Sequence, residues 1–303
     1  MRLSPAEHRR LRRHARLRRE LTGWTFLAPM LFFFVVFLLV PVADTFWWST
    51  RSGGLLGPST SVGFQNYVQF PQLVDATTAV ENTLRFALMS VPLTLVLALI
   101  VALPLARIGR AGAAYRFLIY FPVLVPGVVA GLIWLFLTNV DFGLLNDIFR
   151  GLGLKPVVWL GSSTALPVLA AVDVWRNTGY WAIFFVAALI GLPKELYQAA
   201  ELDGASSVGR FVHLTLPLIR RILLFAIVVS TIWGFQVFDT ALIMTAGGPG
   251  TATTTIIYRV WQYVFAYDNE IGFAAAMSSM LVVAILVLTL MQLWALRSRR
   301  GLD

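Results

Sequence analysis

Polar side chains recur at helical spacing inside one long apolar run of the sequence. They stand at positions i, i+3, i+4 and i+7, which is the spacing of one helix face: Asp173, Arg176, Asn177 and Tyr180. At a rise of about 1.5 Å per residue, a helix that starts at residue 165 places Asp173 about 12 Å and Tyr180 about 22 Å along its axis. Ionisable groups at such membrane depth are costly and mark a solute pathway or a self-neutralising ion pair. The spacing is compatible with a substrate-lining face, with a structural Asp–Arg pair, or with both.

A second candidate face lies on a later apolar run, where Ser230, Trp233 and Val237 share one side and Gly234 leaves room beside them. A tryptophan ring can stack on a sugar ring, although tryptophans that pack or face lipid are commoner. Gln236 and Asp239 follow nearer the expected outer end of this run, and the sequence leaves open whether they serve packing or gating.

Composition excludes most other chemistry. The 303 residues contain no cysteine and three histidines, so thiolate metal sites, disulfides and an H-E-x-x-H zinc motif are absent. Neither Lys155 nor Lys194 follows a glycine, so no G-K-[ST] phosphate loop exists. We therefore assign no catalytic residue, no metal ligand and no bound cofactor, and any ATP used must be hydrolysed by another chain.

The elements that would position these residues are transmembrane helices. Hydrophobic residues make up 58% of the chain and charged residues 13%, with a mean hydropathy of +0.77. Apolar runs of about 20 residues recur without β-type alternation, and each is long enough to cross a bilayer. We predict an all-α polytopic membrane protein with six spans: Trp24–Val42, Phe86–Leu105, Phe117–Leu137, Ala165–Ile190, Ile219–Met244 and Ile271–Leu296. The first run is too long for a signal peptide and lacks a cleavage site, so we expect it to be retained.

Charge fixes the expected orientation. Eighteen Lys and Arg residues, eight of them in the first 20 residues, fall in segments that are cytoplasmic when the N-terminus is inside, and four fall in outer segments. The positive-inside rule then puts both termini in the cytoplasm. The arginine tail serves as a topology determinant beside anionic lipid, which explains the net charge of +9 without nucleic acid. The outer stretches are expected at 43–80, 139–164 and 245–268.

A hydrophilic segment of about 25 residues joins the predicted fourth and fifth spans. Pro193 and Glu195 suit the first turn of a short helix, along which Leu196 and Ala199–Ala200 share a side. Asp203–Gly204 predicts a sharp turn, and a second short helix is expected from Ala205 to about His213, before Pro217 opens the next span. The residues alone leave open whether this hairpin docks on another protein or rests on lipid headgroups.

This segment resembles the EAA signature of permease subunits in binding-protein-dependent ABC importers. The matching string is Gln198-Ala-Ala-x-x-x-Gly204, nine residues, then Leu214-x-Leu216-Pro217, with Gln198 in place of the usual glutamate and Leu214 in place of isoleucine. Its wider form is similar to the sugar and glycerol-phosphate branch, whose model member is the large maltodextrin permease subunit. Further resemblances to that branch occur in order along the chain: Val62-Gly-Phe-x-Asn-Tyr67, Glu81-Asn-Thr-Leu84, Trp175 with Gly179-Tyr180, Phe238-Asp239, Thr245-Ala-Gly-Gly-Pro249 and Gly272-Phe-Ala-Ala-Ala276.

The resemblance implies a division of the chain and a coupling mechanism. Residues 1–78 would form the basic tail, first span and outer loop, 79–296 the importer core, and 297–303 a short cytoplasmic tail. The helix at Pro193–Leu202 would seat in a groove of a cytoplasmic ATPase and rotate the attached spans. The implied ATPase-coupling residues are Pro193, Glu195, Gln198, Ala199, Ala200, Asp203, Gly204, Leu216 and Pro217.

The implied partners are a second, homologous permease in a heterodimer, an ABC ATPase dimer that binds ATP and Mg²⁺, an extracytoplasmic solute-binding protein and the lipid bilayer of the bacterial cytoplasmic membrane. The implied cargo is a sugar or related polyol, and Arg176 is also compatible with a glycerol phosphate. Two alternatives remain: a membrane receptor or assembly subunit that uses the same hairpin without moving solute, and an intramembrane enzyme. For the latter, Asp173 and Asp239 are the only carboxylates well inside predicted spans, and neither has a glycine-framed protease motif.

Overall fold

The computed structural model describes residues 5–54, 58–108, 112–266 and 270–297, with side chains from residue 20 to residue 295. Within these ranges the regular secondary structure is helical apart from one short antiparallel pair, β1 (Arg51–Ser52) with β2 (Thr60–Ser61), and turns and loops connect the elements. The all-helical fold predicted from composition is confirmed. Arg110, Arg299 and Arg300, which counted toward the charge asymmetry, lie outside the described residues.

Three helices are each long and apolar enough to cross a membrane: Glu20–Trp48, α4 (Val74–Arg107) and Ile271–Ala295 within α14 (Ile271–Arg297). The first of these is built from α1 (Pro5–Phe34), η1 (Val35–Leu39) and α2 (Val40–Trp48). Three bent helix pairs also pass when each pair is taken as one span, which brings the total among the described residues to six. The predicted number of spans agrees with this upper count.

The predicted third span, Phe117–Leu137, is not a continuous helix. It divides into α5 (Ala113–Tyr120) with η4 (Phe121–Leu124), and α6 (Gly127–Leu137), which are bent by 95° relative to each other. Pro126 causes the break, because proline lacks the amide donor that a helix needs and forces the residue before it out of helical geometry, whereas Pro122 lies within η4. Val125 accordingly has an extended backbone, with ψ at 121°.

The predicted fifth span, Ile219–Met244, is also interrupted. α12 (Arg220–Phe235) ends at Phe235, and helix resumes at Asp239 and runs into η6 (Ala241–Thr245). The Thr255 hydroxyl donates a 3.0 Å hydrogen bond to the Val237 carbonyl inside this break. A side chain from elsewhere in the fold therefore satisfies a backbone group that an unbroken helix would bond internally.

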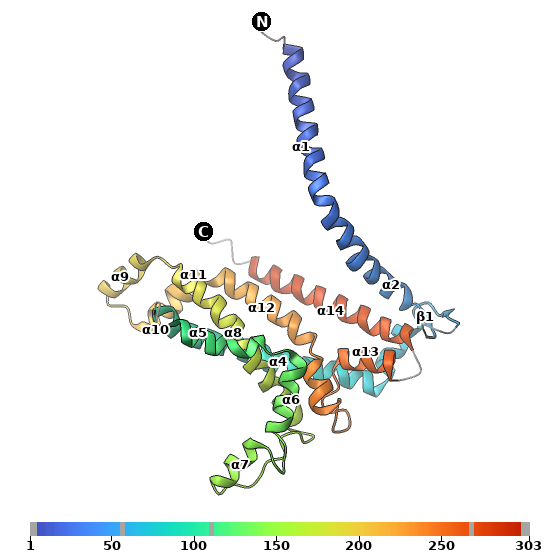
Figure 1. Cartoon of the computed structure of the whole chain (residues 1–303), viewed down its shortest axis with the longest axis vertical. Coiled ribbons are helices and arrows are strands. Elements are labelled where there is room, and N and C mark those ends of the chain that lie inside the picture. The colour runs from blue at the N-terminus through green and yellow to red at the C-terminus, as the bar shows by residue number, and fades with distance from the viewer. Residues whose placement is uncertain (1–4, 55–57, 109–111, 267–269, 298–303) are drawn as a thin grey trace.

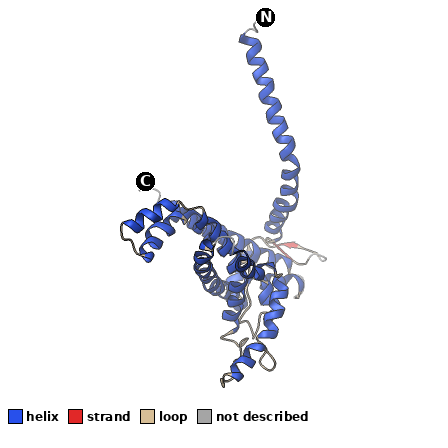
Figure 2. Ribbon diagram, turned by 60° about the vertical axis from the view of Figure 1, so that its left-hand side comes forward, coloured by secondary structure: helices blue, strands red, loops and turns tan. Residues whose placement is uncertain are grey.

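The core forms where α8 (Ala165–Ile190) packs along α4, with α12 against both (Figures 1 and 2). Buried side chains in one cluster include Phe86, Leu169 and Met244, and in a second Leu95, Trp181 and Phe185. α5 approaches α8 so closely that a Cβ atom at Gly179 would overlap the Ile119 carbonyl. A third cluster joins α14 to the start of α4, to η2 (Phe70–Gln72), which follows α3 (Gln65–Gln69), and to α13 (Ile256–Phe265).

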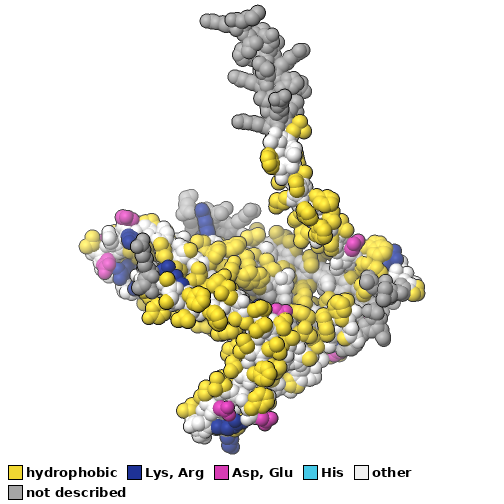
Figure 3. All heavy atoms as spheres, in the orientation of Figure 1, with side chains coloured by type: hydrophobic (Ala, Val, Ile, Leu, Met, Phe, Trp, Pro, Cys, Tyr) yellow, Lys and Arg dark blue, Asp and Glu magenta, His cyan; other side chains and the backbone are white. Residues whose placement is uncertain are grey.

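The first apolar helix leaves this body. Figures 1 and 2 show α1 extending away from the other helices, and α2, which continues it toward β1, approaches α14. In the span Glu20–Trp48 no residue of its most apolar stretch is buried, and Figure 3 shows hydrophobic side chains covering it. This helix needs lipid or another protein to cover it.

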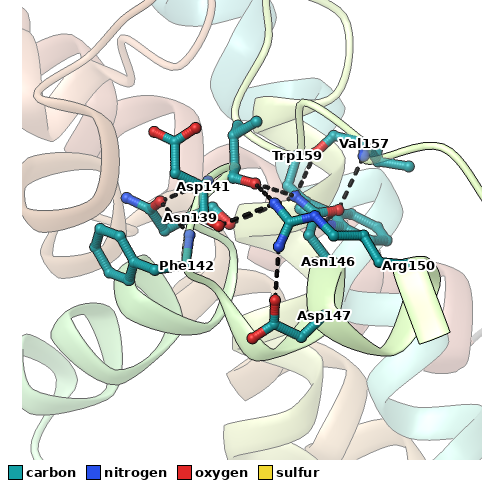
Figure 4. A network of polar contacts seen from close by, with 9 residues as sticks. Asn139, Asp141, Phe142, Asn146, Asp147, Arg150, Val157 and Trp159 are labelled. Atoms are coloured by element: carbon teal, nitrogen blue, oxygen red, sulfur yellow. Dashed lines mark hydrogen bonds and ion pairs between the residues drawn. The ribbon is translucent and has the colours of Figure 1, made fainter.

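A short arm follows α6 and carries α7 (Leu144–Gly151), which projects from the body (Figure 1). Fully buried Asn146 holds it together, because its amide donates to three backbone carbonyls and its oxygen accepts from Val157 N and Trp159 Nε1, at 2.9 and 3.1 Å (Figure 4). Arg150 adds bonds to the carbonyls of Val140 and Asp141. These hydrogen bonds give the arm a defined structure, so it is more than a loose connection between helices.

Candidate functional site: a membrane cavity and a terminal hairpin

A cavity of about 370 Å³ opens between α8, η4 and the break after α12. Five of the pathway residues expected from the sequence line it: Asp173, Arg176, Asn177, Trp233 and Val237. Ser230 lines a smaller void next to it. Tyr180 lies apart from both and packs on Trp181, Phe184 and Trp233. In many membrane transporters, discontinuous helices surround the polar cavity that binds the solute.

The charged groups of the cavity come from two elements. Arg176 Nη1 of α8 lies 3.9 Å from Asp239 Oδ2, at the point where helix resumes after the break. One turn before Arg176 on the same face of α8, Asp173 Oδ1 accepts a 2.8 Å hydrogen bond from the Asn177 amide. Arg176 thus has a carboxylate partner on another element, and Asp173 has an amide partner on its own helix.

The bend between η4 and α6 brings a glycine against this ion pair. A Cβ atom at Gly127 would overlap the Asp239 carboxylate and the Arg176 guanidinium. The first residue of α6 is therefore in contact with both charges, which only a residue without a side chain permits. Three elements meet at this point because the predicted third and fifth spans are both broken.

The break after α12 is held by residues that are distant from it in the sequence. Besides the bond from Thr255 to Val237, the Asn82 amide of α4 donates to the carbonyls of Thr251 and Thr254, at 2.7 and 3.1 Å. The adjacent Thr83 hydroxyl accepts from Ile256 N at 2.9 Å. The turn at 245–255 is thereby fixed to α4, and through it the break keeps its shape.

At the opposite end, α9 (Lys194–Leu202) and α10 (Ser207–Arg210) form a hairpin near the C-terminal end of α14 (Figure 1). The expected turn is present, since Gly204 has φ +77°, Gly204 N donates to Glu201 O, and Ala205 N donates to Ala200 O. These two bonds form a Schellman motif, which ends α9 at a residue that must adopt left-handed backbone geometry. The second expected helix differs from 205–213, because α10 continues through η5 (Phe211–Thr215) into α11 (Leu216–Leu218).

The hairpin is held together by polar contacts between its two arms, and its exposed surface mixes charged, polar and apolar side chains. Tyr197 Oη and Thr215 Oγ1 are 2.9 Å apart, and Arg210 pairs with Glu201 at 3.0 Å. Exposed positions include Pro193, Glu195, Gln198, Ala199, Asp203, Gly204 and Pro217, while Ala200 and Leu216 are partly buried. Leu202 is 90% and Val208 72% exposed. Exposed large apolar side chains on a rigid hairpin are typical of a protein interaction site.

The hairpin and the cavity share their helices. α9 follows α8 at a bend of 73°, and the segment Ser207–Leu218 joins α12 at a bend of 71°. α8 carries Asp173, Arg176 and Asn177, and α12 carries Trp233. The hairpin is therefore continuous in the chain with the two helices that line the cavity.

The sequence analysis did not identify three of the residues that line the cavity, namely Val123, Phe238 and Thr240. It singled out Gln236 and Asp239, which also line the cavity, but did not decide between a packing and a gating role for them. Val123 could have been found, because it lies between Pro122 and Pro126. The two prolines indicate a turn at a place where the apolar run alone predicts a continuous span. Within the described ranges, no group of three or more His, Asp and Glu side chains is placed to hold a metal ion.

Comparison with known proteins places this geometry in a family. Residues 94–301 match the model of the binding-protein-dependent transport system inner membrane component. The chain is 34% identical over 280 residues to the trehalose/maltose transport system permease protein MalF of Thermococcus litoralis, covering 92% of this chain and 94% of that protein. It is 32% identical over 268 residues to the sn-glycerol-3-phosphate transport system permease protein UgpA of Yersinia pestis, covering 87% and 90%.

The fold is also that of a solved transporter. A chain in the crystal structure of a bacterial alginate ABC transporter, in complex with an alginate pentasaccharide-bound periplasmic protein, superposes with a TM-score of 0.81 at 20% identity, covering 92% of this chain and 94% of that one. In this family the membrane subunit is not an enzyme and ATP is hydrolysed by a separate subunit. The chain belongs to the family of inner-membrane permease components of binding-protein-dependent ABC importers.

Proposed function

We propose that this permease, together with a second and homologous permease, forms the translocation pathway for a neutral sugar or related polyol. The cargo is delivered by an extracytoplasmic solute-binding protein, and an ABC ATPase dimer drives the cycle. The name of the trehalose/maltose relative supports a sugar as the cargo. The name of the sn-glycerol-3-phosphate relative points to a phosphorylated polyol instead, and the charges of the cavity decide between the two. The observation that carries the proposal is the joining of the polar cavity to the exposed α9–α10 hairpin through α8 and α12.

The hairpin acts as the coupling element. Its inner ties from Tyr197 to Thr215 and from Arg210 to Glu201 make it move as one piece. Its exposed face seats in a groove of the ATPase, on the cytoplasmic side, where both chain termini also lie. Closure of the ATPase dimer then turns α8 and α12 and switches the cavity from inward-facing to outward-facing.

The charges of the cavity favour a neutral cargo over a phosphorylated one. Two carboxylates, Asp173 and Asp239, face a single guanidinium, Arg176, which is already paired. An anion would compete with Asp239 for Arg176 and would meet a second negative group. Sugar hydroxyls can instead donate to the carboxylates, and the half-exposed indole of Trp233 offers a ring face on which a sugar can stack.

The uncovered first helix supports a partner within the membrane. No residue in the most apolar stretch of the span Glu20–Trp48 is buried against its own chain. A second permease would cover part of this helix. The alternative of a receptor or assembly subunit that moves no solute accounts for the hairpin but leaves the polar cavity without a role.

Reconstitution tests the proposal. The full chain is produced with candidate second-permease and ATPase subunits, inserted in lipid nanodiscs and supplied with a candidate solute-binding protein. We expect ATP hydrolysis that rises when the binding protein carries its sugar, and sugar uptake in proteoliposomes that Trp233→Ala impairs. Co-purification of the subunits with sugar-independent hydrolysis and no uptake would favour the receptor alternative.

A further inference from the structure

A small void lies beside the cavity, between α4, α8 and α12. Thr94 of α4, Trp181 of α8 and Ser230 of α12 line it. Asp173, Asn177 and Trp233 line both the void and the larger cavity, so the two spaces adjoin. The void measures about 10 Å³, and about 10–15 Å³ of such volume accommodates one water molecule.

Three residues around this void carry buried polar atoms that the rest of the described chain does not bond. They are Thr94 Oγ1, Trp181 Nε1 and Ser230 Oγ, and their side chains are 3%, 0% and 5% exposed. Buried polar groups in native proteins nearly always bond to protein or to ordered water. Three such atoms from three helices, around one void, point to a shared ligand.

We propose that the void binds one water molecule that links α4, α8 and α12 beneath the cavity. The water accepts a hydrogen bond from the Trp181 indole and donates one to the Asp173 carboxylate, which already accepts from Asn177 through Oδ1. The hydroxyls of Thr94 and Ser230 can each donate or accept, and they complete the two remaining bonds. All four hydrogen-bonding positions of the water are then used.

The donor set favours water over a cation. An indole N–H donates only, so its hydrogen would oppose a positive ion, whereas sodium, calcium and magnesium require a shell of oxygen ligands. A water molecule can accept from the indole and donate to the carboxylate at once. The ligand is therefore neutral.

Through the water, Thr94, Trp181 and Ser230 act as positioning residues in transport. The water orients the Asp173 side chain, which lines both the void and the cavity. It also links α4 to α8 and α12, the two helices that lead into the hairpin. This role in transport rests on the proposed function, whereas the water site itself does not.

X-ray radiolytic labelling in H₂¹⁸O tests the site on the full chain in lipid nanodiscs, with whatever subunits co-purify. Radiolysis of a bound water oxidises side chains that touch it, even where they are buried. We expect labelling of Trp181, although it is 0% exposed, and none of Phe185, which is equally buried one turn further along α8. Equal labelling of the two would overturn the proposal.

Variants sharpen this test. Ser230→Thr keeps the hydroxyl but adds a methyl group to the void, and we expect Trp181 labelling to fall to the level of Phe185. Thr94→Val removes one bond at nearly constant volume, and we expect weaker labelling. Ser279→Thr is the matched control, because Ser279 is equally buried on α14 and its hydroxyl donates to Ala275 O at 2.8 Å.

Three outcomes would contradict the water site: labelling unchanged by Ser230→Thr, labelling lowered as much by Ser279→Thr, or labelling that falls when choline chloride is replaced by sodium chloride. The last would show a cation in its place. A chain that transports no solute yet labels Trp181 as expected would refute the proposed function and leave the water site standing.

Discussion

Arg176 on α8 pairs with Asp239 across the break after α12, with their nearest charged atoms 3.9 Å apart. The backbone of Gly127, at the start of α6, lies against both side chains. The two breaks in the helical spans therefore meet at one ion pair, which borders the cavity that we propose for the cargo. The first prediction concerns this pair.

Neutralising either partner should affect transport far more than stability. Arg176 is 27% and Asp239 43% exposed at the side chain, and such partly solvated pairs contribute about 0–1 kcal/mol. We expect Arg176→Gln and Asp239→Asn each to lower sugar uptake severely with little change in melting temperature, and the exchange Arg176→Asp with Asp239→Arg to recover part of the uptake. Wild-type uptake by both single variants would show that the pair is unimportant to the pathway.

Gly179 should tolerate no side chain. A Cβ atom there would overlap the backbone carbonyl of Ile119, which unlike a flexible side chain cannot move aside cheaply. Overpacking of this kind costs about 1–3 kcal/mol, so we expect Gly179→Ala to lower the melting temperature of the detergent-solubilised protein. Gly151→Ala is the control, because a Cβ atom at Gly151 in α7 would meet nothing within 4 Å. Equal melting temperatures for the two variants would refute the close approach of α5 and α8.

Gly204→Asp should abolish transport while the protein remains inserted in the membrane. Gly204 has φ +77° and open space around it, so the substitution adds backbone strain, bulk and charge at the exposed corner of the hairpin. Gly153→Asp is the matched control, since Gly153 has φ +73°, equally open surroundings and a place in the arm beyond α7. We expect uptake and sugar-stimulated ATP hydrolysis to be lost in the first variant and kept in the second. Normal uptake by Gly204→Asp would remove the coupling role of the hairpin.

Asn146→Ala should loosen the α7 arm. Removing the side chain leaves Val157 N and Trp159 Nε1 without their acceptor, and each buried group left unbonded costs about 1–3 kcal/mol. We expect faster amide hydrogen exchange and proteolysis between residues 139 and 160. Asp147→Asn, which breaks only the exposed pair with Arg150, should leave both rates nearly unchanged.

Hydropathy predicted the spans best where one helix runs without interruption. It located most of α4, α8 and α14, although α4 begins at Val74, before the predicted start at Phe86 and within the stretch 43–80 that was expected outside the membrane. The turn at Gly204 was recognised because glycine after a short amphipathic helix favours left-handed geometry. The spacing of Asp173, Arg176 and Asn177 also identified the polar face that the cavity uses.

The rest depends on contacts between segments far apart in the chain. No local pattern reveals that Thr255 bonds Val237, that Asn82 fixes the turn at 245–255, or that Asp239 meets Arg176. The bend at Pro126 was within reach of the sequence, because two prolines four residues apart in an apolar run argue against a straight helix. Apolar composition outweighed that signal in the prediction of a continuous third span.

Site-specific crosslinking from the hairpin tests the central claim most directly. The chain has no cysteine, so Gln198→Cys on α9 and Gly153→Cys in the α7 arm each introduce a unique thiol. In intact membranes that contain the partner subunits, we predict that a bifunctional crosslinker on Cys at position 198 captures the ATPase, and that a membrane-impermeant maleimide reaches only position 153. Labelling of position 198 from outside the cell, or a crosslinker there that never captures the ATPase, would contradict the account.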